Sequence, residues 1–253
     1  MNPSPYNAPF TSAHVRAVIL KILLTVGAVA AVMSLLADAV SLAFPPLADE
    51  QELGDNPMGA AIALIIFLLA ILELIIYVTT IVFFLMWLYR AYNNVRAFDP
   101  WRRLDHSAGW AVGSFFIPFV NLVVPYRAVK EVWQKSGPPG EALLSEPGPP
   151  ASFPTWWLFW LLASFAGNIS MRASFNENVP ERTATMISIV ASALSILAAV
   201  FAYLVVDAID KRQEETAGKV KLGQFSGPPP PPPNLPMLGV VAPAASPSSS
   251  QQS

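Results

Sequence analysis

The sequence has 253 residues, of which 54% are hydrophobic and only 13% are charged. Because a soluble domain carries about 25% charged residues, this composition excludes an ordinary globular protein. The net charge of −2 argues against a nucleic-acid partner, since binding to phosphates needs a basic surface. The chain has no cysteine, which excludes disulfides, thiolate metal ligands and cysteine nucleophiles.

The first apolar block covers residues 17–44 and follows a polar segment, residues 1–16. At about 1.5 Å per residue, about 20 apolar residues cross a bilayer core roughly 30 Å thick, so the block is long enough to be a transmembrane helix. The alternative is a cleaved signal peptide, whose apolar region is typically about 7–15 residues long. The greater length here favours an uncleaved span.

The second apolar block covers residues 59–88, and Glu73 is its only charged residue. A charge near the bilayer midplane costs about 2.5–3.5 kcal/mol, so Glu73 needs a partner or a proton. Tyr77 lies one helical turn away and is a candidate hydrogen-bond partner, whereas Lys21 is an imperfect ion-pair partner because it lies toward the inner interface. Glu73 is therefore a candidate site for a transported proton or cation. The structural alternative is a neutral carboxylic acid bonded to a neighbouring helix.

The third apolar block, residues 108–126, contains Pro118, Asn121 and Pro125. The prolines interrupt its helical hydrogen bonds, and the freed backbone groups must be buried in protein or line a wet cavity. Transporters use such broken segments to bind substrates and ions, and Asn121 would add a polar side chain. The alternative, which we favour, is a re-entrant hairpin, held by Asn121, that braces the cytoplasmic mouth of a helical bundle.

The basic residues decide whether this third block crosses the membrane, because lysine and arginine concentrate in short cytoplasmic loops. If residues 108–126 enter the membrane and return, all but two of the 15 lysines and arginines are cytoplasmic, the exceptions being Arg172 and Arg182. If the block crosses, the basic residues divide almost evenly between the two sides. The distribution therefore predicts four spans, a re-entrant third block and both termini in the cytoplasm.

The segment that follows predicts an amphipathic helix over residues 126–136. Its apolar residues recur at helical spacing and are Tyr126, Val129, Val132 and Trp133. The opposite face carries the polar residues Arg127, Lys130, Glu131, Gln134 and Lys135. The apolar stripe lies in lipid, with Arg127, Lys130 and Lys135 toward anionic headgroups, or packs on the ends of the spans, and the two arrangements are not exclusive.

The last two spans are predicted over residues 154–170 and 184–206, after a flexible loop rich in proline and glycine, residues 137–152. Small residues at four-residue spacing mark packing faces on the first and last spans. These residues are Gly27, Ala31, Ala191, Ser195 and Ala199. Residues 213–253 are expected to form a disordered cytoplasmic tail, whose proline run at 228–233 is a candidate ligand for a partner protein.

All seven tryptophans fall in or beside segments assigned to the cytoplasmic interface: Trp87, Trp101, Trp110, Trp133, Trp156, Trp157 and Trp160. Tryptophan favours this layer because its ring is apolar while its N–H can still find a partner. Together with the basic residues, the tryptophans predict a cytoplasmic face that is both basic and Trp-rich.

Little in the sequence supports enzymatic activity. The two histidines, His14 and His106, do not occur in a metal-ligand spacing, and neither a nucleophile elbow nor a phosphate-binding glycine loop is present. The polar cluster of Arg102, Arg103, Asp105 and His106 at the inner interface is explained by a solvated loop. We therefore expect no catalytic residue, no metal and no cofactor.

A series of motifs runs from Trp87 to Trp133, and its defining positions are Trp87, Arg90, Asn94, Gly109, Trp110, Pro118, Asn121 and Pro125. Over roughly residues 59–212 this pattern resembles the bacterial membrane family known as domain of unknown function 4328. Ala108 departs from the pattern, because the family is expected to have proline before the Gly-Trp pair. The resemblance implies a location in the bacterial inner membrane and does not imply any activity.

Together these features predict an all-α, polytopic membrane helical bundle with four transmembrane helices and a re-entrant, interfacial segment, within a membrane domain of residues 17–212. The leading hypothesis is a non-enzymatic inner-membrane protein that organises partners or anionic lipids through its basic, Trp-rich cytoplasmic face. The alternative is a small proton- or cation-coupled transporter or channel that uses Glu73, Tyr77 and the broken segment around Asn121.

Overall fold

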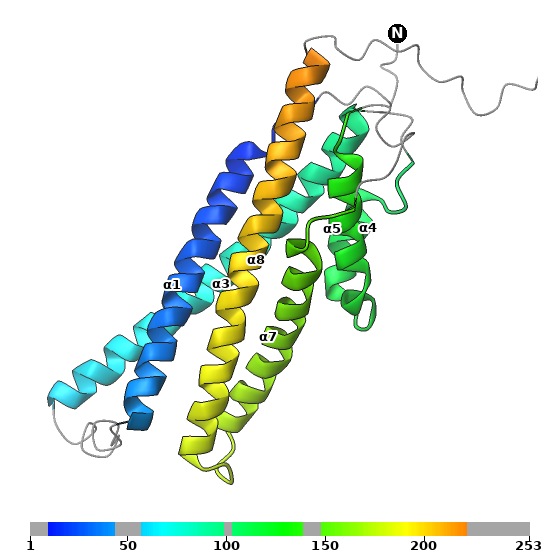
Figure 1. Ribbon diagram of the computed structural model, residues 1–253. Coiled ribbons are helices and arrows are strands. Elements are labelled where there is room, and N and C mark those ends of the chain that lie inside the picture. Colours follow the sequence, from blue (N-terminus) through cyan, green and yellow to red (C-terminus); the bar gives the residue numbers. More distant parts are fainter. Residues whose placement is uncertain (1–9, 44–56, 99–102, 139–147, 222–253) are drawn as a thin grey trace, which may run out of the picture.

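The computed structural model describes residues 10–43, 57–98, 103–138 and 148–221. Within these ranges every regular element is a helix, so the all-α prediction is confirmed. The long helices are α1 (His14–Ala43), α3 (Pro57–Phe98), α7 (Ser152–Ser174) and α8 (Glu181–Lys221) (Figure 1). The proline run of the tail and the centre of the loop before α7 lie outside the described residues.

Helix α8 is the centre of the bundle, and α1 and α7 pack along it (Figure 1). Its small residues Ala191, Ala198 and Ala202 are at most 8% exposed, which allows close approach between helices. Helix α3 behaves differently, because those of its residues that the structure describes as buried all lie at or beyond Trp87. Its first half diverges from α7 and α8, as Figure 1 shows.

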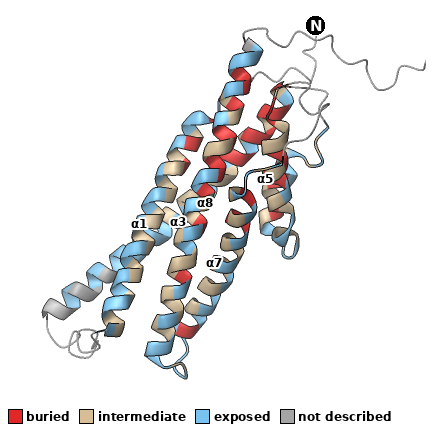
Figure 2. Cartoon of the chain, viewed as in Figure 1, coloured by how far each residue is buried: buried red, intermediate tan, exposed pale blue. Residues whose placement is uncertain are grey.

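One end of the bundle holds most of the buried side chains, and we call it the polar end (Figure 2). The beginnings of α1 and α7 meet the ends of α3, α5 and α8 there. Arg90 Nε donates to the carbonyl of Thr11 at 3.2 Å, and Gln213 Nε2 donates to the carbonyl of Ala91 at 2.8 Å. The helices away from this end expose long apolar side chains, as expected for surfaces that face lipid.

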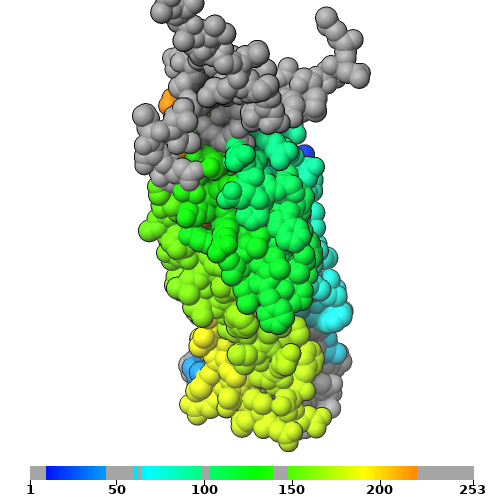
Figure 3. All heavy atoms as spheres, turned by 90° about the vertical axis from the view of Figure 1, so that its right-hand side faces the viewer, coloured from blue at the N-terminus to red at the C-terminus, as the bar shows by residue number. Residues whose placement is uncertain are grey.

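Residues 108–135 form a helical hairpin that leaves the polar end and returns to it (Figures 1 and 3). It contains α4 (Ala108–Gly113), the 3-10 turns η2 (Ser114–Phe116) and η3 (Val120–Leu122), and α5 (Val124–Lys135). Ser107 caps α4, its hydroxyl accepting from the Trp110 N–H at 3.1 Å. The segment expected to be re-entrant therefore reverses direction within the bundle.

The tip of this hairpin is a tight turn at Pro118. The Asn121 N–H donates to the carbonyl of Ile117 at 2.9 Å, so part of the backbone freed by the proline is satisfied locally. Phe119 has a φ of 64°, in the left-handed region that side chains with a Cβ rarely adopt. Phe116 and Phe119 are 70% and 85% exposed, so the tip presents an apolar surface.

One boundary differs from that expected. Helix α8 continues to Lys221, so the predicted start of a disordered tail at residue 213 falls inside a helix. Lys211 and Asp207 lie one helical turn apart, and the salt bridge between Lys211 Nζ and Asp207 Oδ2, at 2.7 Å, supports this extension of the helix. Gln213 and Thr216 are each 2% exposed, because the extension packs against α3 and α5 rather than entering solvent.

Among the residues that the structure describes, three helices are long and apolar enough to cross a membrane: His14–Ala43, Phe67–Phe98 and Glu181–Val220. The chain is thus compatible with a membrane-embedded, all-helical protein. Helix α7 corresponds to the fourth expected span, residues 154–170, but it is not among these three.

The buried core of the polar end predicts a clear contrast between two residues of α8. Ile209 is fully buried, so Ile209→Ala should lower the free energy of unfolding by about 2–5 kcal/mol, because it leaves a cavity. Leu204 is 44% exposed, and Leu204→Ala should change it by about 0.5 kcal/mol or less. Denaturant unfolding in detergent micelles, followed by circular dichroism, measures both. Equal losses would contradict the assignment of the core.

Candidate functional site

A group of charged side chains joins the start of α1 to the end of α8. Lys21 Nζ lies 3.0 Å from Asp207 Oδ1 and 3.7 Å from Asp210 Oδ2. His14 Nδ1 lies 2.9 Å from Asp210 Oδ2, and Asp210 is only 4% exposed. Lys21, considered above as an imperfect partner for Glu73, is therefore engaged by two other carboxylates. It is not the partner of Glu73.

Glu131 forms a second cluster between α3, α5 and the segment before α4. Its carboxylate is 5% exposed and accepts hydrogen bonds from the hydroxyl of Tyr92 and the N–H of Asp105. His106 Nδ1 lies 3.0 Å from Glu131 Oε2, and its side chain is 18% exposed. The interpretation of Glu131 as a residue of the outward polar face is wrong. Arg103 and Asp105 are exposed, as a solvated loop predicts, whereas His106 is half-buried against Glu131. Helical spacing predicted that Glu131 lies on the polar face of the helix, but the contacts with its three partners bury it.

An amide network explains why Asn94 belongs to the motif. Asn94 Nδ2 donates to Gln213 Oε1 at 3.1 Å, and both residues are 2% exposed. Gln213 Nε2 lies 3.0 Å from Ser136 Oγ, and Thr216 Oγ1 donates to the Ser136 carbonyl at 2.8 Å. The network therefore connects α3, the end of α5 and the extension of α8 through buried polar groups that satisfy one another.

The described tryptophans lie toward the polar end, where three of the six are buried in its core and Trp133 and Trp160 pack against it. Trp87, Trp156 and Trp157 are at most 8% exposed, whereas Trp110 is 46% exposed. Trp157 Nε1 donates to the carbonyl of Leu122 at 3.2 Å and so ties α7 to the hairpin. The expected interfacial belt is therefore in large part internal packing, and Trp101 lies outside the described residues.

The apolar stripe of α5 also packs inside the protein. Val129 and Val132 are fully buried in the core of the polar end. Of the two arrangements that the sequence allowed, these residues therefore adopt packing on the other helices. Arg127 is exposed and Lys130 is half-buried on the same helix. The guanidinium of Arg212 lies 4.6 Å from the ring centroid of Trp133, within range of a cation–π contact.

A cavity of about 460 Å³ lies between α1, α3, η2, α7 and α8, and both Glu73 and Tyr77 line it. Their side chains are exposed, and within the described part of the chain no hydrogen bond joins them. Asn121 is not among the described residues that line this cavity, so the structure does not bring the three candidates together. The buried Asn121 Oδ1 has no partner among the described residues.

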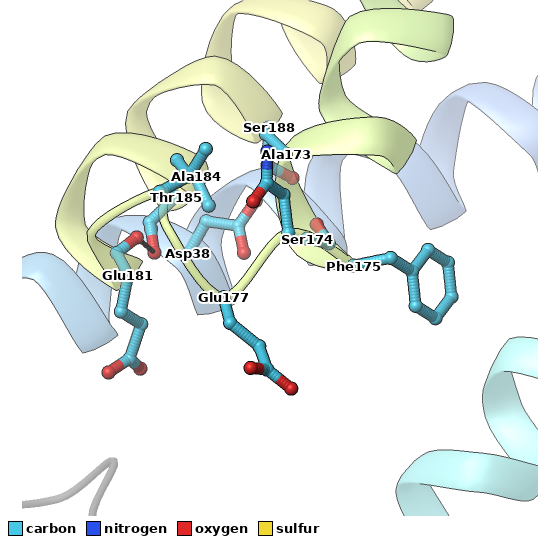
Figure 4. A pocket seen from close by; sticks show the side chains of 11 residues that line it. Asp38, Ala173, Ser174, Phe175, Glu177, Glu181, Ala184, Thr185 and Ser188 are labelled. Carbon is cyan, nitrogen blue, oxygen red and sulfur yellow. Dashed lines mark hydrogen bonds between the residues drawn. The ribbon is translucent and has the colours of Figure 1, made fainter.

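A second cavity, of about 550 Å³, lies at the opposite end of the bundle, where α7 turns into α8 (Figure 4). Asp38, Glu177 and Glu181 line it. Figure 4 shows Glu177 and Glu181 extending away from the helices, so the three carboxylates do not converge. Among the residues that the structure describes, no group of histidine, aspartate and glutamate side chains could hold a metal ion.

These features define an all-helical protein with several membrane-compatible helices and a polar end held by buried hydrogen bonds. The family described as domain of unknown function 4328 matches residues 53–211, which include every motif position identified in the sequence. The chain belongs to this family. Comparison with curated proteins and with solved structures found no match.

The burial of Glu131 predicts that Glu131→Gln is destabilising. The amide keeps the shape of the side chain but loses the charge that strengthens its hydrogen bonds, so we expect a loss of about 1.5–3 kcal/mol in the free energy of unfolding. Glu215→Gln on the exposed side of α8 is the matched control and should change it by about 0.5 kcal/mol or less. Thermal unfolding in micelles compares the two. Indistinguishable stabilities would show that Glu131 does not hold the polar end together.

Proposed function

We propose that this chain is a four-span protein of the bacterial inner membrane, with both termini and the polar end on the cytoplasmic side. The charges support this orientation, because the lysines and arginines that the structure describes fall on the side of the polar end, except Arg172 and Arg182, which fall on the other. The opposite orientation would put nearly all of the basic residues outside.

The packing of α7 along α8 supports a fourth span. Helix α7 has 23 residues and so is about 34 Å long, enough for a hydrocarbon core of roughly 30 Å. It begins near the polar end and joins α8 at the opposite end (Figure 1). If α8 crosses the membrane, the turn between them lies on the far side, and α7 must cross as well.

At the polar end, we propose a non-enzymatic role in which the protein organises anionic lipids and, with them, partner proteins. The observation that carries this proposal is the orientation of α5: Val129 and Val132 are buried in the protein, which leaves Arg127 on the outside near the apolar tip of the hairpin. Basic side chains beside an apolar anchor are well suited to anionic headgroups. Lys130 and Lys135 extend the same basic helix.

The test is the affinity of the purified protein for phosphatidylglycerol against phosphatidylcholine, measured by native mass spectrometry of retained lipid. Each basic residue near an anionic membrane contributes about 1 kcal/mol, so the double variant Arg127→Gln, Lys130→Gln should bind phosphatidylglycerol about 30-fold more weakly. The double variant Arg172→Gln, Arg182→Gln is the control from the other end and should bind normally. Unchanged affinity in the α5 variant would overturn the proposal.

The second candidate function is proton- or cation-coupled transport. The cavity lined by Glu73 and Tyr77 favours it, because it places one acidic group among four long helices at membrane depth. Asn121 lies outside that lining, so in this function it would stabilise the hairpin rather than contact the same ion. Proton flux into vesicles, lost in Glu73→Gln, is the corresponding measurement.

A further inference from the structure

The cavity around Glu73 exists because α3 diverges where the neighbouring helices carry small residues. Gly27 and Ala31 on α1 and Ser195 and Ala199 on α8 all line it. The sequence predicted that these residues form close-packing faces, and in the structure they also border the cavity. A Cβ at Gly27 would find nothing within 4 Å. The missing side chains leave room for a ligand rather than for a neighbouring helix.

The lining has the chemistry of a site for an organic cation. Six aromatic residues surround the cavity together with Glu73: Tyr77, Phe84, Phe115, Phe116, Trp156 and Trp160. Aromatic faces and a carboxylate both attract an ammonium or phosphonium group. The hydroxyls of Thr80 and Ser164 already donate to carbonyls of their own helices, each at 2.7 Å, so they present acceptors to the cavity.

The described residues around the cavity supply no positive charge for Glu73. Lysine, arginine and histidine are absent from the described residues that line the cavity, and Lys21 is held by Asp207 and Asp210. A carboxylate at membrane depth is stabilised by a cation or by a proton. A volume of about 460 Å³ is also in the range of sites that enclose small molecules.

We propose that this cavity binds a lipophilic organic cation, that is, an ammonium or phosphonium centre carried on apolar groups, with Glu73 as its counter-ion. The proposal deepens the second candidate function by naming its ligand class. It requires binding alone, whether or not the ligand is then transported. It is independent of the anionic-lipid site on α5, which uses different residues.

The test uses tetraphenylphosphonium as the probe and the full-length protein in detergent micelles, with binding measured by isothermal titration calorimetry. Glu73→Gln should weaken binding about 30-fold or more, because Glu73 is the only charged residue among the described residues that line the cavity. Gly27→Leu should also weaken binding by filling the cavity, and it leaves Glu73 in place. Glu177→Gln, at the opposite end of the bundle, is the matched control and should bind normally.

A neutral probe separates charge recognition from simple partitioning. Triphenylphosphine oxide should bind weakly, and Glu73→Gln should not change its affinity. Circular dichroism and size-exclusion chromatography establish that each variant is folded. Tetraphenylphosphonium binding that is unchanged in Glu73→Gln, or in Gly27→Leu, would overturn the proposal. Glu73-dependent binding without proton flux in vesicles would retain this site and reject transport, so the two outcomes are distinguishable.

Discussion

The buried carboxylate of Glu131 is the interaction on which the arrangement of the polar end depends. It accepts hydrogen bonds from Tyr92 on α3 and from the backbone of Asp105, and it pairs with His106. These contacts hold the end of α5 beside the segment that precedes α4, so the hairpin must return to the end from which it left. The direction of α7, and therefore of α8, follows from that return.

The two halves of the bundle are stabilised in different ways. At the polar end, apolar side chains such as Trp87 and Ile209 are buried in a core, and buried polar groups satisfy one another. Within a bilayer, an apolar helix surface is solvated by lipid as well as by a neighbouring helix, so close packing between helices depends on small residues. Helix α3 can therefore diverge from α7 and α8 without a large cost. The cavity beside Glu73 is a consequence of this difference.

Local sequence patterns predicted the features that depend on local physics. Apolar blocks predicted helices of sufficient length, and Pro118 predicted the interruption that becomes the hairpin tip. The burial of Glu131 could not be predicted in this way, because Tyr92 lies 39 positions away and helical spacing alone placed Glu131 on the polar face. Lys21 was likewise considered as a partner for Glu73. The carboxylates that it contacts belong instead to a turn of α8, where Asp207 lies 186 positions further along the chain. The spacing of Asp207, Asp210 and Lys211 was a signal that the helix continues beyond the last apolar residue.

The central claim is that the hairpin returns to its own side of the membrane while α7 crosses, and the absence of cysteine allows a direct test. Single cysteines are placed at Arg103, before the hairpin, at Gly148, after it, and at Asn178, in the turn between α7 and α8, all of them exposed. A membrane-impermeant maleimide is applied to cells with a permeable outer membrane. Asn178→Cys should react at once, and the other two only after lysis. Reaction of Gly148→Cys before lysis, with Arg103→Cys protected, would show that residues 108–126 cross the membrane and would contradict the account.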